Sequence, residues 1–132
     1  MAQLTCIVVT PEQTALEADA DFLALPLFDG EIGIAPGHSP MIGRLGYGEM
    51  RLVTGDKTSR YYVDGGFVQV VNNVVSVLTS RAVRADKVDA NLARQQLEAA
   101  MHRPANSAEL LDIRDRAIAQ ARAQIRVAEH SR

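Results

Sequence analysis

Apolar residues in the first two thirds of the chain fall in short runs that are separated by turn residues. The runs are rich in β-branched and aromatic residues, which favour strands, and they predict strands at about 3–10, 14–18, 20–27, 31–35, 48–54, 58–64, 66–72 and 74–80. Asn72-Asn73 and Gly55-Asp56-Lys57 indicate hairpin turns, and Asp64-Gly65-Gly66 indicates a further bend. Many short strands with frequent turns indicate a β-sandwich or small barrel of about eight to ten strands.

The pattern changes near Arg84. Residues 85–132 contain no glycine and are rich in Ala, Arg, Gln, Glu and Leu, a composition typical of helices. The sequence therefore predicts an α+β chain that is mainly β. We expect a β-sandwich over residues 1–84 and an antiparallel two-helix hairpin over residues 85–132.

The ends of both helices can be predicted from capping residues. Asp86 is suited to cap the first helix, with Asp89 in its first turn, and the proline that follows should end this helix near Arg103. Asn106 or Ser107 is suited to cap a second helix that reaches almost to the last residue. The short connection between the helices predicts that they lie antiparallel.

The apolar stripes of the two helices are thin and rich in alanine. Alanine buries little area, so we expect the hairpin to be held weakly and to detach or extend at modest cost. The residues expected to face each other are Val88, Leu92, Ala93, Leu97, Ala100 and Met101 on the first helix, and Leu110, Leu111, Ala117, Ile118, Ala121, Ile125 and Ala128 on the second.

Arginine is concentrated in the second helix. Residues 113–132 carry five arginines against two acidic residues. Arg114, Arg116, Arg122 and Arg126 either form a solvated helix face or contact an acidic partner surface or a phosphate.

The bulk composition excludes several classes of function. The chain has 132 residues, which is enough for one ordinary domain or two small modules, and its net charge of −2 predicts no broad nucleic-acid or membrane-binding field. Its single cysteine, Cys6, cannot form an intramolecular disulfide and is expected to be buried. No apolar run approaches the length of a membrane span, so we expect a soluble, cytoplasmic chain that another protein would have to hold at any membrane.

The segment 29–42 is the most unusual part of the sequence. It contains three glycines, two prolines, one histidine and two acidic residues between apolar runs. So many residues that constrain the backbone predict a rigid, exposed platform for docking.

Catalytic and metal-binding patterns are weak or absent. Gly37-His38-Ser39-Pro40-Met41 lacks the final glycine of a nucleophile elbow, no phosphate-binding loop occurs, and the three histidines show no metal-ligand spacing. Glu31 and His38 could in principle form an acid–base pair, but a docking role is favoured. Two alternatives stay open: a small enzyme that uses the His38 loop, and a free-standing ligand-binding β-sandwich.

Three segments carry a resemblance to a known family. Residues 31–40 resemble the Gly-Glu-Ile/Leu-Gly-Ile-x-Pro-Gly-His-Ser/Ala-Pro signature of the epsilon subunit of bacterial F-type ATP synthases. Residues 63–70 are similar to the glycine-pair strand of this family, and residues 84–86 to its domain junction. The resemblance covers essentially the whole chain and implies a non-catalytic rotor subunit.

The resemblance also implies partners for particular residues. Glu31, Ile32 and Gly33 would face the c-ring, and His38 and Met41 would lie nearer the gamma subunit. The family's helical hairpin folds against the sandwich or extends along gamma. When it is extended, Arg114, Arg116, Arg122 and Arg126 would contact the alpha and beta subunits and block ATP hydrolysis. The chain would then lie peripherally on the cytoplasmic face of the bacterial plasma membrane, without inserting into it.

Some family members bind ATP between the two helices through an Ile/Leu-Asp-x-x-Arg-Ala motif. The matching segment here is 88–93, in which Leu92 stands where the family has arginine. Asp89, Arg122 and Arg126 are the remaining candidates for a nucleotide contact. The resemblance therefore implies weak ATP binding or none, and no other cofactor.

Overall fold

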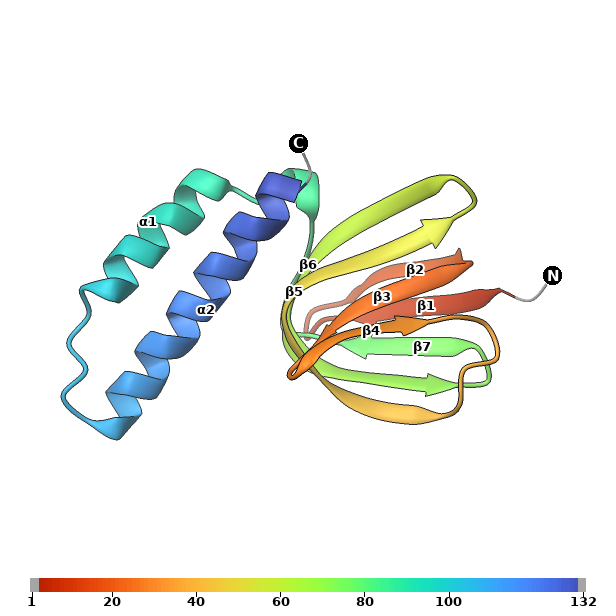
Figure 1. Ribbon diagram of the computed structural model, residues 1–132, viewed down its shortest axis with the longest axis horizontal. Coiled ribbons are helices and arrows are strands. Elements are labelled where there is room, and N and C mark those ends of the chain that lie inside the picture. The colour runs from red at the N-terminus through yellow and green to blue at the C-terminus, as the bar shows by residue number, and fades with distance from the viewer. Residues whose placement is uncertain (1–2, 131–132) are drawn as a thin grey trace.

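Eight strands, a short 3₁₀ helix and two α-helices form the part of the chain described by the computed structural model, residues 3–130 (Figure 1). The strands are β1 Leu4–Val9, β2 Thr14–Ala20, β3 Phe22–Leu27, β4 Gly30–Ile34, β5 Met41–Thr54, β6 Lys57–Val71, β7 Val74–Leu78 and β8 Ala82–Arg84. The helices are η1 Ala85–Lys87, α1 Ala90–Met101 and α2 Ala108–His130. The predicted mainly β fold with a C-terminal helical hairpin is confirmed.

The strands form a single hydrogen-bonded sheet that folds into a sandwich. Its order is β2-β1-β7-β6-β5-β3-β4, and β8 pairs with β6 beside this path. The pairing of β1 with β7 is parallel, and the other pairings are antiparallel. The long strands β5 and β6 curve across the molecule and join its two layers (Figure 1).

Glycines allow these two strands to bend, and this explains where the sequence prediction was wrong. β5 begins at Met41 rather than near residue 48, and β6 is one strand where two were expected. Gly65 and Gly66 have φ values of +71° and +109° inside β6, so the strand bends there without ending. In β5, a Cβ atom at Gly46 would lie 2.9 Å from the carbonyl oxygen of Leu27, so only glycine allows this close approach. The short strand β8 was not predicted.

The core lies between the two layers. Alternate residues of β1 point inward, so Leu4, Cys6 and Val8 are fully buried, as was predicted for Cys6. Fifteen buried residues from β1, β2, β3, β4, β5, β6 and β7 form one contiguous cluster. The Asn72-Asn73 turn has φ values of +51° and +64°, which confirms the predicted hairpin between β6 and β7.

The helix caps differ in part from the prediction. Asp86 lies in η1 and caps nothing, whereas Asp89 is the N-cap of α1 and its Oδ1 accepts a hydrogen bond of 3.0 Å from the Leu92 amide. Asp89 is the better placed residue because a short 3₁₀ turn separates β8 from α1. Ser107 caps α2 through a 3.1 Å hydrogen bond to its Oγ from the Leu110 amide, as predicted.

The helices pack antiparallel through a narrower stripe than expected. The buried residues of α1 are Ala90, Ala93 and Ala100, whereas Leu92 and Met101 are about half exposed, at 48% and 51%, so their prediction as facing residues was wrong. Leu110 and Leu111 are also exposed, because the first turns of α2 extend beyond the end of α1 (Figure 1). Small alanines allow close helix packing but bury little area.

Candidate functional site

The loop between β4 and β5 lies at the end of the sandwich that is remote from the helices (Figure 1). The Gly37 amide donates a 2.8 Å hydrogen bond to Oδ1 of Asn73, which ties this loop to the β6–β7 turn. The His38 amide donates to the Ala35 carbonyl at 3.2 Å, and the His38 ring lies 2.7 Å from the Ser39 carbonyl oxygen. These hydrogen bonds connect the loop to the β6–β7 turn and to itself, and its role as a rigid docking platform stays a prediction.

Glu31 lies at the opposite end of β4 from this loop. Its carboxylate accepts two hydrogen bonds from Arg51, at 2.8 and 3.1 Å, and these raise the pKa of Arg51. Ile32 packs against the core, and Gly33 is exposed. A Cβ atom at Gly33 would lie 2.7 Å from the Phe22 ring. The Glu31 carboxylate binds Arg51 and the His38 ring contacts the Ser39 carbonyl, so the geometric basis for an acid–base pair between Glu31 and His38 is lacking.

The outer face of β5, β6 and β7 carries an apolar patch that the sequence reasoning missed. The largest exposed side chains are Ile42 at 76%, Phe67 at 58% and Leu78 at 50%, and Val71 and Val74 complete what we call the apolar face. Phe67 is paired with Leu78, and Val71 with Val74, so these side chains are cross-strand neighbours.

Met41, which the sequence singled out, does not belong to this face. It packs against the core from the inner side of β5, and the next residue, Ile42, points outward. Residues 67–78 carried the signal for the apolar face. In this segment apolar residues fall at positions that point to both faces of the sheet, whereas a half-exposed strand has them on one face only. Sequence alone could not distinguish this pattern from a strand that is buried on both sides.

The helical hairpin rests on the sandwich through one side of α2. Ala123 and Val127 of α2 form a small buried cluster with Tyr62 and Ala85, and Tyr47 and Val88 pack around it. Figure 1 shows α2 between α1 and the sandwich. The apolar contact that holds the hairpin therefore depends on two side chains of α2.

A polar cluster at Asp64 adjoins this contact. The Asp64 carboxylate accepts hydrogen bonds from the Tyr62 hydroxyl at 2.6 Å, from Ser80 at 3.1 Å and from the Gln120 amide at 3.1 and 3.3 Å. Burial, and then the hydrogen bond to Asp64, raise the pKa of Tyr62. Because Gln120 lies on α2, this cluster is a directional contact between the hairpin and the sandwich.

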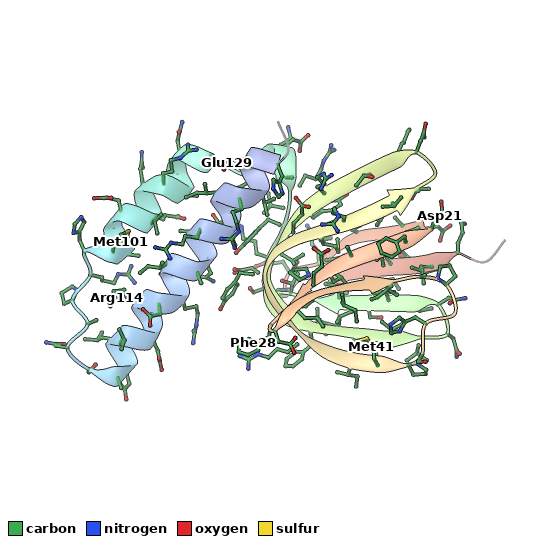
Figure 2. The ribbon with its side chains drawn as sticks, viewed as in Figure 1. Asp21, Phe28, Met41, Met101, Arg114 and Glu129 are labelled. Atoms are coloured by element: carbon green, nitrogen blue, oxygen red, sulfur yellow. The ribbon has the colours of Figure 1, made fainter. Side chains whose placement is uncertain are left out.

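The four candidate arginines of α2 do not share one surface in this arrangement. Arg114 is partly buried, with its Nε 3.9 Å from an Asp115 oxygen, and it lies on the side of α2 that faces α1 (Figure 2). Arg116 lines a cleft of about 580 Å³ beside the sandwich, and Arg126 lines a cavity of about 190 Å³ near Glu31. Arg122 is exposed. The fifth arginine of the segment, Arg132, lies outside the described residues.

The residues proposed for a nucleotide contact do not fit an ATP site here. The Asp89 carboxylate caps α1, and Leu92 supplies no charge. Arg126 lines the cavity between α2 and the sandwich instead of one between the helices.

Two further features bear on the kind of site this is. Among residues 3–130, no group of three or more His, Cys, Asp or Glu side chains is arranged to hold a metal ion. In the same part of the chain, no helix is both long enough and apolar enough to cross a membrane.

The fold and these surfaces place the chain in a class of small subunits built from a β-sandwich and a helical hairpin. Residues 3–85 match the family described as ATP synthase, Delta/Epsilon chain, beta-sandwich domain. The ATP synthase epsilon chain of Rhodopirellula baltica is 50% identical over 123 residues, which cover 93% of this chain and 96% of that relative. The epsilon chain of Desulfitobacterium hafniense is 37% identical over 123 residues, which cover 93% and 92%.

Solved structures share the fold. A chain of the mitochondrial ATP synthase of Euglena gracilis superposes with a TM-score of 0.83 at 21% identity, covering 93% of this chain and 79% of that one. A chain from the central stalk and c-ring structure of Tetrahymena thermophila ATP synthase superposes with a TM-score of 0.76 at 13% identity, covering 96% and 97%.

The chain belongs to the ATP synthase epsilon chain family. It is thus a non-catalytic, central-stalk subunit of ATP synthase. A non-catalytic subunit of ATP synthase is neither a small enzyme nor a free-standing ligand-binding module. The assignment therefore excludes both alternatives that the sequence had left open.

Proposed function

We propose that the β-sandwich, residues 1–84, fixes the gamma subunit to the c-ring so that the three turn together. The apolar face supports this proposal, because its side chains are exposed in the described chain and a partner would remove them from water. The rigid β4–β5 loop, with His38, lies at the same end of the sandwich as the Asn72-Asn73 turn beside this face. We assign the apolar face and this loop to gamma.

The c-ring contact is assigned to β4, where Glu31, Ile32 and Gly33 lie. β4 is the last strand in the sheet order, so one of its backbone edges is unpaired by other strands. The Glu31 carboxylate forms an ion pair with Arg51 at this edge, at 2.8 Å. An edge strand with a fixed carboxylate offers both backbone and charged contacts to a partner's loop.

The helical hairpin, residues 85–132, is proposed to regulate ATP hydrolysis. In the docked arrangement Arg114, Arg116, Arg122 and Arg126 are distributed around α2, and two of them face the sandwich. Release of α2 would free these arginines to contact acidic segments of the alpha and beta subunits. Regulation of this kind requires two arrangements that differ by only a few kcal/mol, and the small contact around Val127 supports this.

The proposed location follows from the proposed partners. Held by gamma and the c-ring, the chain would lie peripherally at the cytoplasmic face of the bacterial plasma membrane.

A pull-down tests the gamma assignment. Tagged full-length chain is used to capture partners from detergent-solubilised membranes, with wild type compared against the double variant Ile42→Asp and Phe67→Asp. Both side chains are more than half exposed, so the substitutions should leave the fold intact. We expect wild type to recover gamma and c subunits, and the variant to recover gamma at least tenfold less, since charge would be buried in the interface.

Leu92→Asp is the matched control, because Leu92 is a comparably exposed apolar residue in the first turn of α1, where an acidic residue suits the helix dipole. Its recovery of gamma should equal that of wild type. Undiminished capture by the double variant would contradict the assignment of this face.

A further inference from the structure

Glu49 of β5 has an oxygen that is buried without a hydrogen-bond donor. The side chain is only 10% exposed, and its Oε1 accepts hydrogen bonds from Arg60 at 2.8 Å and from Arg51 at 3.4 Å. Its Oε2 has no hydrogen-bond partner. A buried carboxylate oxygen without a donor is costly, so the site favours any group that can supply a proton to it.

His130, in the last turn of α2, lies beside this oxygen. Its Nδ1 lies 3.4 Å from Oε2 of Glu49, and both residues line the cavity of about 190 Å³ between α2 and the sandwich. Protonation would turn the imidazole into a cation directly opposite the unpaired oxygen. Histidine is the side chain whose ordinary charge change falls between about pH 5 and pH 8.

The other charged groups around His130 are largely paired with one another. Glu31 of β4 binds Arg51 of β5, and Arg84 of β8 binds Asp86 of η1 at 3.2 Å. Arg60 of β6 binds the other oxygen of Glu49.

On α2 itself, Glu129 binds Arg94 of α1 at 3.4 Å, and Arg126 lines the same cavity as His130. Arg126 opposes a charge on His130, but Glu49 is the carboxylate in direct contact with the ring.

We propose that the contact between His130 and Glu49 is a proton-dependent latch that holds the end of α2 on the sandwich. The latch lies one helical turn from Val127, so it reinforces the small apolar cluster through which the hairpin docks. Lower pH favours the docked hairpin, and higher pH favours its release. If the helices inhibit ATP hydrolysis, acidification would relieve the inhibition by docking them. Only this consequence rests on the proposed function.

The latch is measured on the isolated full-length chain, independently of gamma and the c-ring. A donor and an acceptor dye are attached at Asp56→Cys, in the β5–β6 turn, and at Met101→Cys, at the end of α1. Cys6 is fully buried and stays unlabelled. Because a tightly docked hairpin would hide any change, the labelled chain also carries Val127→Ala, which weakens the apolar contact and populates both arrangements.

We expect the ratio of docked to undocked chains to rise about threefold between pH 8 and pH 6, the effect of one partly exposed ion pair. His130→Gln and Glu49→Gln should each abolish this rise. His102→Gln is the matched control, since His102 pairs with Glu98 at 2.8 Å on the exposed side of α1 and should leave the pH response unchanged. A pH-independent ratio in the parent chain, or a response that survives His130→Gln, would overturn the latch while leaving the docking proposal intact.

Discussion

At the scale of single residues, the glycine pair in β6 shows how one position can shape the sandwich. Gly65 and Gly66 both have positive φ, and a Cβ atom at Gly66 would lie 1.9 Å from the Leu78 carbonyl oxygen. No side chain fits there unless β7 moves. The bend lets β6 pair with β8 on one side of it and with β7 on the other, and it places Asp64 toward α2.

Gly66→Ala should therefore be strongly destabilising, by about 3 kcal/mol or more, because backbone strain and a backbone clash act together. Gly55→Ala is the matched control, since Gly55 also has positive φ but a Cβ atom there has no neighbour within 4 Å. Gly55→Ala should lower the free energy of unfolding by about 1 kcal/mol. Urea unfolding of both variants measures the difference, and equal losses would refute the role assigned to the clash.

Cys6 makes stability depend on pH in the alkaline range. Burial raises the pKa of this thiol from 9.0 to about 12, so the folded chain holds the proton more tightly than the unfolded chain. The associated stability is complete below pH 9 and is lost as the pH rises toward 12. We expect the free energy of unfolding to fall by about 1.4 kcal/mol per pH unit across this range from Cys6 alone.

Cys6→Ala separates this effect from the one that Tyr62 adds, since the raised pKa of Tyr62 remains in the variant. The variant should show a shallower decline than wild type above pH 9 in denaturant titrations. Parallel declines in the two proteins would show that Cys6 does not titrate as its burial requires.

At the scale of elements, the sequence predicted the kinds of element better than their limits. Alternating burial in β1 and the helix-forming composition after Arg84 have direct physical causes, so this strand and the two C-terminal helices were predicted correctly. The continuity of β5 and β6 could not be read from the sequence, because a glycine that ends a strand and one that bends it look the same without the neighbouring backbone. The apolar face was missed for a similar reason, because the sequence does not show whether another part of the chain covers the Phe67 side chain.

The packing of α2 on the sandwich is the contact between elements that can be tested most directly. Val127→Ala removes two methyl groups from the buried cluster with Tyr62, and it should weaken docking by about 1–2 kcal/mol without unfolding the sandwich. The dye pair at positions 56 and 101 reports this as a lower docked fraction at constant pH. Ile113→Ala, on an exposed part of the same helix, is the control and should leave the docked fraction unchanged. An equal loss in both variants would mean that the cluster does not hold the helix.

At the scale of the whole molecule, a continuous β-sandwich carries a helical hairpin through a small contact. In the described residues the sandwich is one continuous sheet around one core, which suits the proposed role of fixing gamma to the c-ring. The hairpin contacts it through a small apolar cluster, the Asp64 hydrogen bonds and the His130–Glu49 contact. This division predicts that the sandwich suffices for assembly and that the hairpin acts only on hydrolysis.

The most direct test is the ATP hydrolysis rate of ATP synthase assembled with the full chain or with a chain that ends after Arg84. The account predicts that the shortened chain assembles with gamma and the c-ring as well as the full chain does, and that hydrolysis rises severalfold when the arginines of α2 are absent. Failure of the shortened chain to assemble, or an unchanged hydrolysis rate, would contradict the division between a docking sandwich and a regulatory hairpin.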